Sequence, residues 1–397
     1  MSRRVVITGL GVISSIGEKL EEFWDNCQKG VSGISNIKGN NITLLTSRNG
    51  GQVQSFNPEK YVKTNDAFKI GRGSQLLIAA MRRSIEDSDI NYEIYKDAAL
   101  VVGTTMGEVS SQETHLLSKE NKHPSDDLRE QNNLQTILSN ATSEFKLEGK
   151  ASLIGNACAS GNYALINAFE SIRNGKTNVA FAAGVDPFST VAYYGFHRLN
   201  AIAPQVCSPF DKNRRGMMVA EGAGCLLLED YEHAMRRNAK IYAEVAGYGV
   251  STDAHHITAP HPEGEGLISC MNMAIHSANI KPEDVSYISA HGTGTAANDK
   301  AEGKAINEVF GSRTPVSSIK SMLGHSMGAA SAIESIVCCL AIRDQVAPPT
   351  INFNELDPEL SIDCIENTKR EFPINIALNN SSAFGGMNAS VVFQKIN

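Results

Sequence analysis

The sequence predicts a layered α/β protein whose sheets are buried on both faces. Short β-rich runs alternate along the whole chain with stretches whose apolar residues recur at helical spacing, as at residues 74–90 and 264–278. This alternation is typical of sheets covered by helices in three or more layers. No Pro/Ser-rich linker or low-complexity segment divides the chain, which indicates one compact body. The predicted strands are residues 4–9, 98–103, 179–184, 224–229, 241–247, 285–290, 315–319 and 390–394.

The order of these elements also predicts an internal duplication. A helical segment that ends at Ile90 leads into a β run ending in Gly-Thr-Thr at residues 103–105, and one that ends at Ile280 leads into a β run ending at residues 291–295. Later in each half a helix contains Glu-Ser-Ile. We therefore expect two related halves, residues 1–240 with the best cysteine candidate and residues 241–397 with two histidine candidates.

Composition narrows the classes of function. Hydrophobic residues make up 42% and charged residues 20% of the 397 residues, as in ordinary globular proteins. No window approaches the roughly 18 consecutive apolar residues of a membrane helix, and the start is too poor in apolar residues for a signal peptide, so we expect a cytoplasmic protein. The net charge of −7 disfavours nucleic acid as a partner. The eight cysteines lack zinc-site spacing, and no metal or cofactor is expected.

Cys158 is the strongest candidate for a nucleophile. It lies in Ile-Gly-Asn-Ala-Cys-Ala-Ser-Gly, residues 154–161, between a β run and a predicted helix. Unpaired N–H groups at a helix start lower the pKa of a thiol, and the small neighbours leave room for a substrate. The alternative is a buried structural cysteine, so the interpretation requires partner residues.

Two histidines supply such partners. His291 begins His-Gly-Thr-Gly-Thr, and His325 lies in Leu-Gly-His-Ser-Met-Gly; each follows a β run and is surrounded by small and hydroxyl residues. Such surroundings indicate sharp turns that face a cavity. Either histidine alone could be structural, but one cysteine with two such histidines indicates a nucleophile with two polarising groups.

Three other patterns are rejected. Residues 9–11, Gly-Leu-Gly, open like a dinucleotide fingerprint, but Ser14 stands where the third glycine is needed. Residues 324–328 match the Gly-x-Ser-x-Gly elbow of hydrolases, yet no histidine follows Ser326 as that fold requires. Asp253 and the nearby histidines, His255, His256 and His261, match no metal-binding spacing.

Taken together, these segments resemble the β-ketoacyl-acyl-carrier-protein synthases of the thiolase superfamily, in particular the type II elongating branch. The resemblance covers nearly the whole chain, and several motifs in one order make it specific. The segments that carry it are residues 5–11, 209–211, 220–224, 241–244, 289–295, 318–328, 348–352 and 384–388.

The resemblance implies a role for each matching residue. Cys158 corresponds to the nucleophile that accepts the acyl group, and His291 and His325 to the pair that binds the malonyl thioester carbonyl and supports decarboxylation. The other implied residues are Lys320 with Glu334 as its charge partner, Thr293 and Thr295 near the malonyl carboxylate, Phe384 as a gate whose backbone N–H joins that of Cys158 in an oxyanion hole, and Met106 at the base of the acyl pocket.

The implied fold is the thiolase fold, two βαβ-rich halves packed in five layers, α-β-α-β-α. The implied partners are acyl carrier protein, loaded with an acyl or a malonyl group, and a second ketosynthase-like chain, which is either a copy of this chain or a chain-length-factor-like homologue. Because acyl carrier proteins are acidic, we expect a basic surface at the entrance to the cysteine. The candidates are Lys63, Lys69, Arg72, Arg214 and Arg215.

Departures from the fatty-acid pattern leave the pathway open. Ser382 and Ala383 stand before Phe384 where fatty-acid enzymes usually carry Phe-Gly, and Met387 replaces a threonine, which puts the usual gate motion in question. Asn298 and Asp299 after the His-Gly-Thr-Gly-Thr motif are closer to ketosynthases of type II polyketide or polyene systems. A non-catalytic chain-length factor and a degradative thiolase are the alternatives, but the first typically lacks the cysteine and the second needs another cysteine near the chain end.

Overall fold

The computed structural model describes residues 3–38, 47–64, 66–111, 113 and 133–396. Within these residues one eleven-stranded sheet runs through the molecule in the order β12-β10-β9-β14-β15-β8-β1-β7-β6-β4-β5. Two short pairs, β2 (Ser35–Asn36) with β3 (Asn49–Gly50) and β11 (Val346–Ala347) with β13 (Arg370–Glu371), lie outside it. The strands of the eleven-stranded sheet are β1 (Val5–Ile13), β4 (Ala99–Gly103), β5 (Ala151–Ile154), β6 (Val179–Asp186), β7 (Gly222–Asp230), β8 (Ala243–Thr252), β9 (Tyr287–Ser289), β10 (Pro315–Ser317), β12 (Asp363–Cys364), β14 (Ile376–Ala383) and β15 (Met387–Gln394).

The two halves of the sheet repeat one topology. The order β5-β4-β6-β7-β1 in the first half matches β10-β9-β14-β15-β8 in the second. Equivalent strands also run in equivalent directions, because β4 is parallel to β5 and β6 as β9 is to β10 and β14, and the remaining pairs are antiparallel. The halves meet where β1 pairs with β8. The predicted duplicated α/β fold is confirmed, while the boundary near residue 240 stays a prediction.

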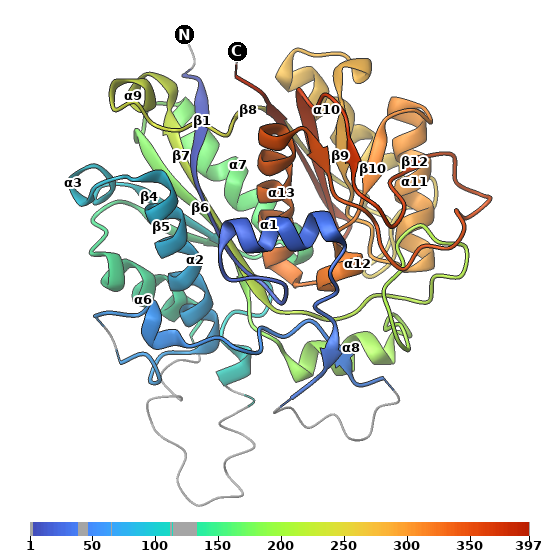
Figure 1. The fold of residues 1–397 in the computed structure, drawn as a ribbon, viewed down its shortest axis with the longest axis horizontal. Coiled ribbons are helices and arrows are strands. Elements are labelled where there is room, and N and C mark those ends of the chain that lie inside the picture. Colours follow the sequence, from blue (N-terminus) through green and yellow to red (C-terminus); the bar gives the residue numbers. More distant parts are fainter. Residues whose placement is uncertain (1–2, 39–46, 65, 112, 114–132, 397) are drawn as a thin grey trace, which may run out of the picture.

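Helices form three layers around the two halves of the sheet (Figure 1). α2 and α6 cover the outer face of the first half, α10 and α11 cover that of the second, and α7 and α13 lie between the halves. Nearly every residue of α13 is buried, as expected of a helix that is apolar on all sides. The helices are α1 (Leu20–Lys29), α2 (Arg72–Ser88), α3 (Tyr92–Tyr95), α6 (Gln135–Phe145), α7 (Ser160–Arg173), α8 (Thr190–Arg198), α9 (Tyr231–Arg236), α10 (Glu265–Ala278), α11 (Ala296–Phe310), α12 (Lys320–Leu323) and α13 (Ala330–Asp344).

The repeated Glu-Ser-Ile segments do lie in equivalent helices but not at equivalent positions. The first lies near the end of α7 and the second near the start of α13. That part of the sequence match was therefore coincidental, whereas the order of strands and helices was informative. Among the described residues, no helix combines the length and hydrophobicity needed to cross a bilayer.

Glycines allow the central helices to start close together. A Cβ added at Gly161, in the first turn of α7, would lie 2.6 Å from the backbone N of Ala332 in α13. Gly184 of β6 and Gly224 of β7 face the same turn of α13, with added Cβ atoms 2.8 Å from the Ala332 Cβ and 2.9 Å from the Ile333 N. The start of α13 therefore packs directly against backbone on three sides.

Replacing Gly161 by alanine should destabilise the protein, because the new methyl group must push the first turns of α7 and α13 apart. Overpacking of this kind typically costs about 1–3 kcal/mol, which thermal unfolding would detect as a lower Tm. Gly195 in α8 is the matched control, since nothing lies within 4 Å of its added Cβ. Gly195→Ala should leave Tm unchanged or raise it, and equal effects of both substitutions would contradict the packing argument.

Candidate active site

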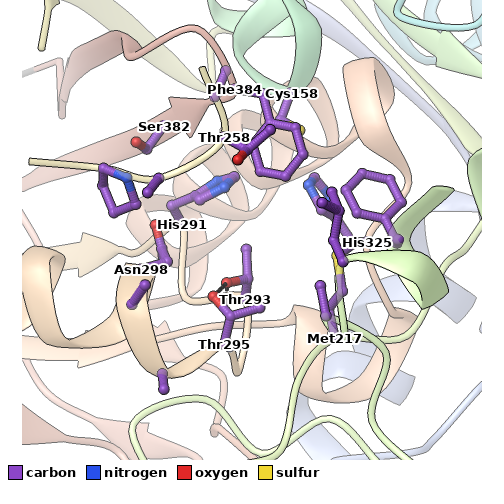
Figure 2. Close-up of a pocket in the computed structure, with 18 of the residues that line it drawn as sticks. Cys158, Met217, Thr258, His291, Thr293, Thr295, Asn298, His325, Ser382 and Phe384 are labelled. Atoms are coloured by element: carbon purple, nitrogen blue, oxygen red, sulfur yellow. Dashed lines mark hydrogen bonds between the residues drawn. The ribbon is translucent and has the colours of Figure 1, made fainter. Parts of the chain in front are cut away.

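A cavity of about 300 Å³ lies where the chain leaves β5, β9, β10 and β14, strands of both halves (Figure 2). Ligand sites of α/β proteins commonly lie at the carboxyl ends of parallel strands. Six residues to which the resemblance assigned a role in the site line this cavity: Cys158, His291, Thr293, Thr295, His325 and Phe384. The other lining residues are Phe196, Leu199, Asn200, Ala201, Met217, Thr258, Ala259, Pro260, Ala296, Ala297, Asn298, Ser382 and Ala383.

Cys158 lies in a tight turn between β5 and α7. A 3-10 turn, η2 (Ala157–Ala159), runs directly into α7, and Ala157 has a φ of 45°, in the left-handed region. Such a conformation costs a non-glycine residue on the order of 1–3 kcal/mol, so its surroundings must hold it. The Ser160 hydroxyl does so, because it donates to the Ala157 carbonyl at 2.6 Å and accepts from the Asn156 N–H at 2.8 Å.

Burial dominates the acidity of Cys158. The sequence predicted a lowered pKa from the helix start, but desolvation raises the pKa of the Cys158 thiol to about 12, opposed by the positive charge of Lys320. The prediction of a low pKa is therefore wrong, because the side chain is only 7% exposed. A neutral thiol must lose its proton as it attacks, and a neutral imidazole is a suitable acceptor.

Lys320 fixes the state of His291. Its buried Nζ donates to the His291 carbonyl at 2.6 Å and to the Glu334 carboxylate, and it lies 3.4 Å from His291 Nδ1. An ammonium group can only donate, so Nδ1 of His291 accepts and the ring proton lies on Nε2. The ion pair of Lys320 with Glu334 that the sequence predicted is thus present, and it orients His291 from behind the cavity.

Both imidazoles are neutral at pH 7. Burial, together with the charge of Lys320, lowers the pKa of His291 and of His325 well below the usual value. The two rings lie edge to face with centroids 5.4 Å apart (Figure 2). Nδ1 of His325 is buried and has no hydrogen-bond partner among the described residues. Two neutral rings can offer N–H donors to a developing oxyanion without first binding a proton.

Two buried carboxylates hold the turn that carries His291. Glu302 accepts hydrogen bonds from the backbone N–H groups of residues 291 and 292, and Asp299 accepts from those of residues 293 and 294. Both acids come from the first turns of α11 and lie on one face of it. This role was not predicted, although two acids three residues apart directly after a glycine-rich turn were a usable signal.

The other predicted residues of the cavity are also placed. Thr293 and Thr295 contact each other, with their hydroxyl oxygens 2.9 Å apart. Phe384 is 37% exposed and its ring centroid lies 5.5 Å from that of Phe196 in α8. The aromatic pair therefore forms one side of the cavity mouth, and Phe196 had not been predicted.

Met106 lies apart from the residues that line this cavity. Its side chain packs against a buried cluster that includes Phe188, Tyr193, Val219 and Met327. The expectation that Met106 forms the base of an acyl pocket stays a prediction.

The histidine-containing loop around Asp253 forms a wall of the cavity. Thr258, Ala259 and Pro260 line it, and the His261 N–H donates to Asp253 at 2.9 Å. Within the part of the chain that the structure describes, no group of three or more His, Cys, Asp and Glu side chains is placed to hold a metal ion.

Two of the five residues expected in a basic surface have structural partners instead. The Arg214 side chain is 5% exposed and donates to Asp357 at 2.6 Å, and Arg72 forms a two-pronged contact with Glu221. The Arg214 side chain is therefore too buried to take its expected place on that surface, whereas Arg72, whose side chain is 27% exposed, stays a candidate. Lys63, Lys69 and Arg215 are exposed and stay candidates.

Comparisons with known proteins agree with this geometry. The family model described as beta-ketoacyl synthase, N-terminal domain, matches residues 2–234, and the one described as beta-ketoacyl synthase, C-terminal domain, matches residues 242–354. Proteins named 3-oxoacyl-[acyl-carrier-protein] synthase 2 from Staphylococcus aureus (strain COL) and Vibrio harveyi are 35% and 36% identical, with 99% of both chains covered.

Two solved structures extend the comparison. One, described as the ishigamide ketosynthase/chain length factor, has a TM-score of 0.96 at 37% identity. The other, a type II polyketide synthase acyl-carrier protein in complex with its ketosynthase, has a TM-score of 0.91 at 32% identity. In both comparisons all of this chain and all of the other are covered.

The chain therefore belongs to the β-ketoacyl synthase family. It is an acyltransferase of the 3-oxoacyl-acyl-carrier-protein synthase class, which elongates acyl chains in fatty-acid or polyketide synthesis.

Removing the carboxylate of Glu334 should destabilise the protein strongly, because it leaves the Lys320 ammonium buried without its counter-charge. Loss of one partner of a buried ion pair typically costs about 3–5 kcal/mol, which denaturant unfolding of Glu334→Ala would measure. The double variant Lys320→Met with Glu334→Leu should recover much of that stability. It should still lose condensation activity, because the donor to His291 is gone. Equal stability loss in both variants would contradict this account.

Proposed function

We propose that Cys158 accepts an acyl group as a thioester and that the chain condenses this group with malonyl-acyl-carrier protein by decarboxylation. The observation that carries the proposal is that Cys158, His291 and His325 come from both halves of the chain to line one cavity. A nucleophile and two neutral donors in one cavity are what a ping-pong condensation requires.

In the first half-reaction the Cys158 sulfur attacks the incoming thioester carbonyl. Its proton passes to a neutral imidazole and from there to the sulfur of the carrier protein, which leaves as a thiol. In the second half-reaction the malonyl group loses CO₂, and the electron pair of the broken C–C bond moves into the thioester carbonyl, where the N–H groups of His291 and His325 stabilise the enolate oxygen. The enolate carbon then attacks the acyl carbon on Cys158, and the backbone N–H groups of Cys158 and Phe384 hold the tetrahedral oxyanion. Its collapse breaks the bond to sulfur, and the Cys158 thiolate takes up a proton from solvent.

A non-catalytic chain-length factor is not favoured for this chain. Such partners typically lack the nucleophile, whereas here Cys158 and both histidines are present and line the cavity. In Figure 2, Thr293 and Thr295 lie below His291, whereas Cys158 lies above it. We propose that the two threonines face the malonyl carboxylate.

The pathway we propose is a specialised type II polyketide or polyene pathway. Its support is the sequence of residues 291–299 and the similarity to the ishigamide ketosynthase/chain length factor structure. Acyl carrier protein is the proposed substrate carrier, and a chain-length-factor-like homologue or a second copy of this chain is the proposed partner. A cytoplasmic location also stays a proposal.

Cys158→Ala should abolish covalent acyl loading, whereas His325→Ala should impair loading less than it impairs condensation. The histidine variant should condense about 10²–10³-fold more slowly, since it lacks one donor to the enolate oxygen. Intact-mass spectrometry after incubation with a panel of acyl-carrier proteins measures loading, and product mass measures condensation.

Cys207→Ala is the matched control for the nucleophile, because Cys207 is buried beside the site with its thiol 3.2 Å from the Thr293 carbonyl. It should load normally. Acyl groups that remain on Cys158→Ala, or histidine variants that condense at the original rate, would refute the assignment.

Lys69→Glu should weaken binding of acyl carrier protein several-fold at low salt and less at high salt, since exposed charges are screened. Lys69 is 63% exposed, and it lies just before α2, whose first turn contacts Glu108 beyond the carboxyl end of β4. Turnover of a small thioester analogue should be almost unaffected.

Lys281→Glu is the control for charge, because Lys281 is 75% exposed but precedes β9, at the opposite end of that strand from His291. If both reversals weaken binding equally, the effect is one of net charge and Lys69 is not part of the docking surface.

A further inference from the structure

Asp186 is a buried carboxylate that joins two turns near the cavity. It is the last residue of β6 and has no exposed surface. Its oxygens accept from the Thr104 hydroxyl at 2.6 Å, the Thr105 N–H at 2.9 Å and the Met106 N–H at 2.7 Å. They also accept from the Gly328 N–H at 2.6 Å. The first three donors follow β4, and the fourth belongs to the second half of the chain.

Gly328 lies three residues after His325, in the 3-10 turn η4 (Met327–Ala329) that begins α13. The other side of this turn is held by the segment before β7, because the His325 N–H donates to the Met218 carbonyl at 2.6 Å and the His325 carbonyl accepts from Ala220 at 2.9 Å. Asp186 is thus the second of two anchors on the turn that carries His325.

Gly328 is packed too tightly for any side chain. A Cβ added there would lie 2.9 Å from the Asp186 carboxylate and 2.9 Å from the Thr104 Cα. The end of β4 also packs against the segment that follows Cys158, because a Cβ on Gly103 would lie 2.2 Å from the carbonyl oxygen of Ser160. A shift of either turn would therefore change the geometry between Cys158 and His325.

The groups that donate hydrogen bonds to Asp186 are uncharged backbone N–H and hydroxyl groups. Burial raises the pKa of Asp186 to about 6, and those hydrogen bonds oppose the rise. Its negative charge also raises the pKa of the Cys158 thiol. A buried carboxylate is costly for stability, and here it makes the nucleophile less acidic, so its benefit must lie in what it positions.

We propose that Asp186 is a positioning residue for condensation, which locks the His325 turn to the turn of residues 104–106 and so holds the His325 ring in register with an acyl group on Cys158. The inference rests on the proposed function. Asp186 does not line the cavity, so it acts through His325 rather than on the substrate.

Asp186→Asn is the first test, because it keeps the shape but places an amide N–H₂ opposite backbone donors. Condensation kcat should fall about 10–100-fold, since small displacements of catalytic groups cost that much. Acyl loading of Cys158 and the KM for malonyl-acyl-carrier protein should stay within about twofold of the original values. The split between loading and condensation separates positioning from general loss of structure.

Thr104 supplies a second test if Asp186→Asn does not fold. Thr104→Val removes the hydroxyl that donates to Asp186 and accepts from the Gly107 N–H, whereas Thr104→Ser keeps it. Valine should reproduce the selective loss of condensation, and serine should restore it.

The outcomes are distinguishable. If the unmodified protein loads acyl groups but never condenses them, the proposed function fails. If the unmodified protein does condense them, the folded variants Asp186→Asn and Thr104→Val test the role of Asp186. That role is overturned if both variants condense at the original rate, or if both lose loading and condensation equally.

Discussion

α7 and α13 begin side by side between the two halves of the sheet, and the spacing of their first turns sets the geometry of the site. Each helix follows a 3-10 turn whose first residue, Ala157 or Met327, has a left-handed backbone. Glycines at 161, 184 and 224 let these turns pack backbone against backbone. Cys158 and His325 are therefore placed by rigid parts of the fold rather than by long loops, which is the condition for a preorganised site.

Buried charge completes this arrangement. Lys320 orients His291, burial and the charge of Lys320 lower the pKa of both rings, and Asp299 and Glu302 hold the backbone of residues 291–294. Each carboxylate has backbone donors whose positions are fixed before substrate binds. The stability lost by burying these groups is offset by a site that needs little reorganisation during the reaction.

Much of the fold and the centre of the site followed from the sequence, because strand order and glycine-rich turns leave strong local patterns. Cys158, His291 and His325, which line one cavity in the structure, were singled out in that way. β14 was missed because its second half, residues 379–382, is polar although it is buried, and the Asn379 side-chain N–H₂ donates to Asn162, Ser331 and Ser335 on the central helices. Only the assembled structure supplies those partners. The same holds for the burial of Arg214 and for the raised pKa of Cys158, which depend on neighbours far away in sequence.

The repeat also places two equivalent turns in the structure, and these turns carry different residues. Gly328 stands in the second half where Cys158 stands in the first, at the middle of the 3-10 turn before the central helix. The space that a side chain would need there is filled by Asp186 and Thr104. The turn in the first half thus presents the Cys158 thiol to the cavity. The equivalent turn in the second half has a glycine, whose backbone N–H donates to Asp186. The two halves of the repeat therefore supply different groups to one cavity, a thiol from the first and two imidazoles from the second.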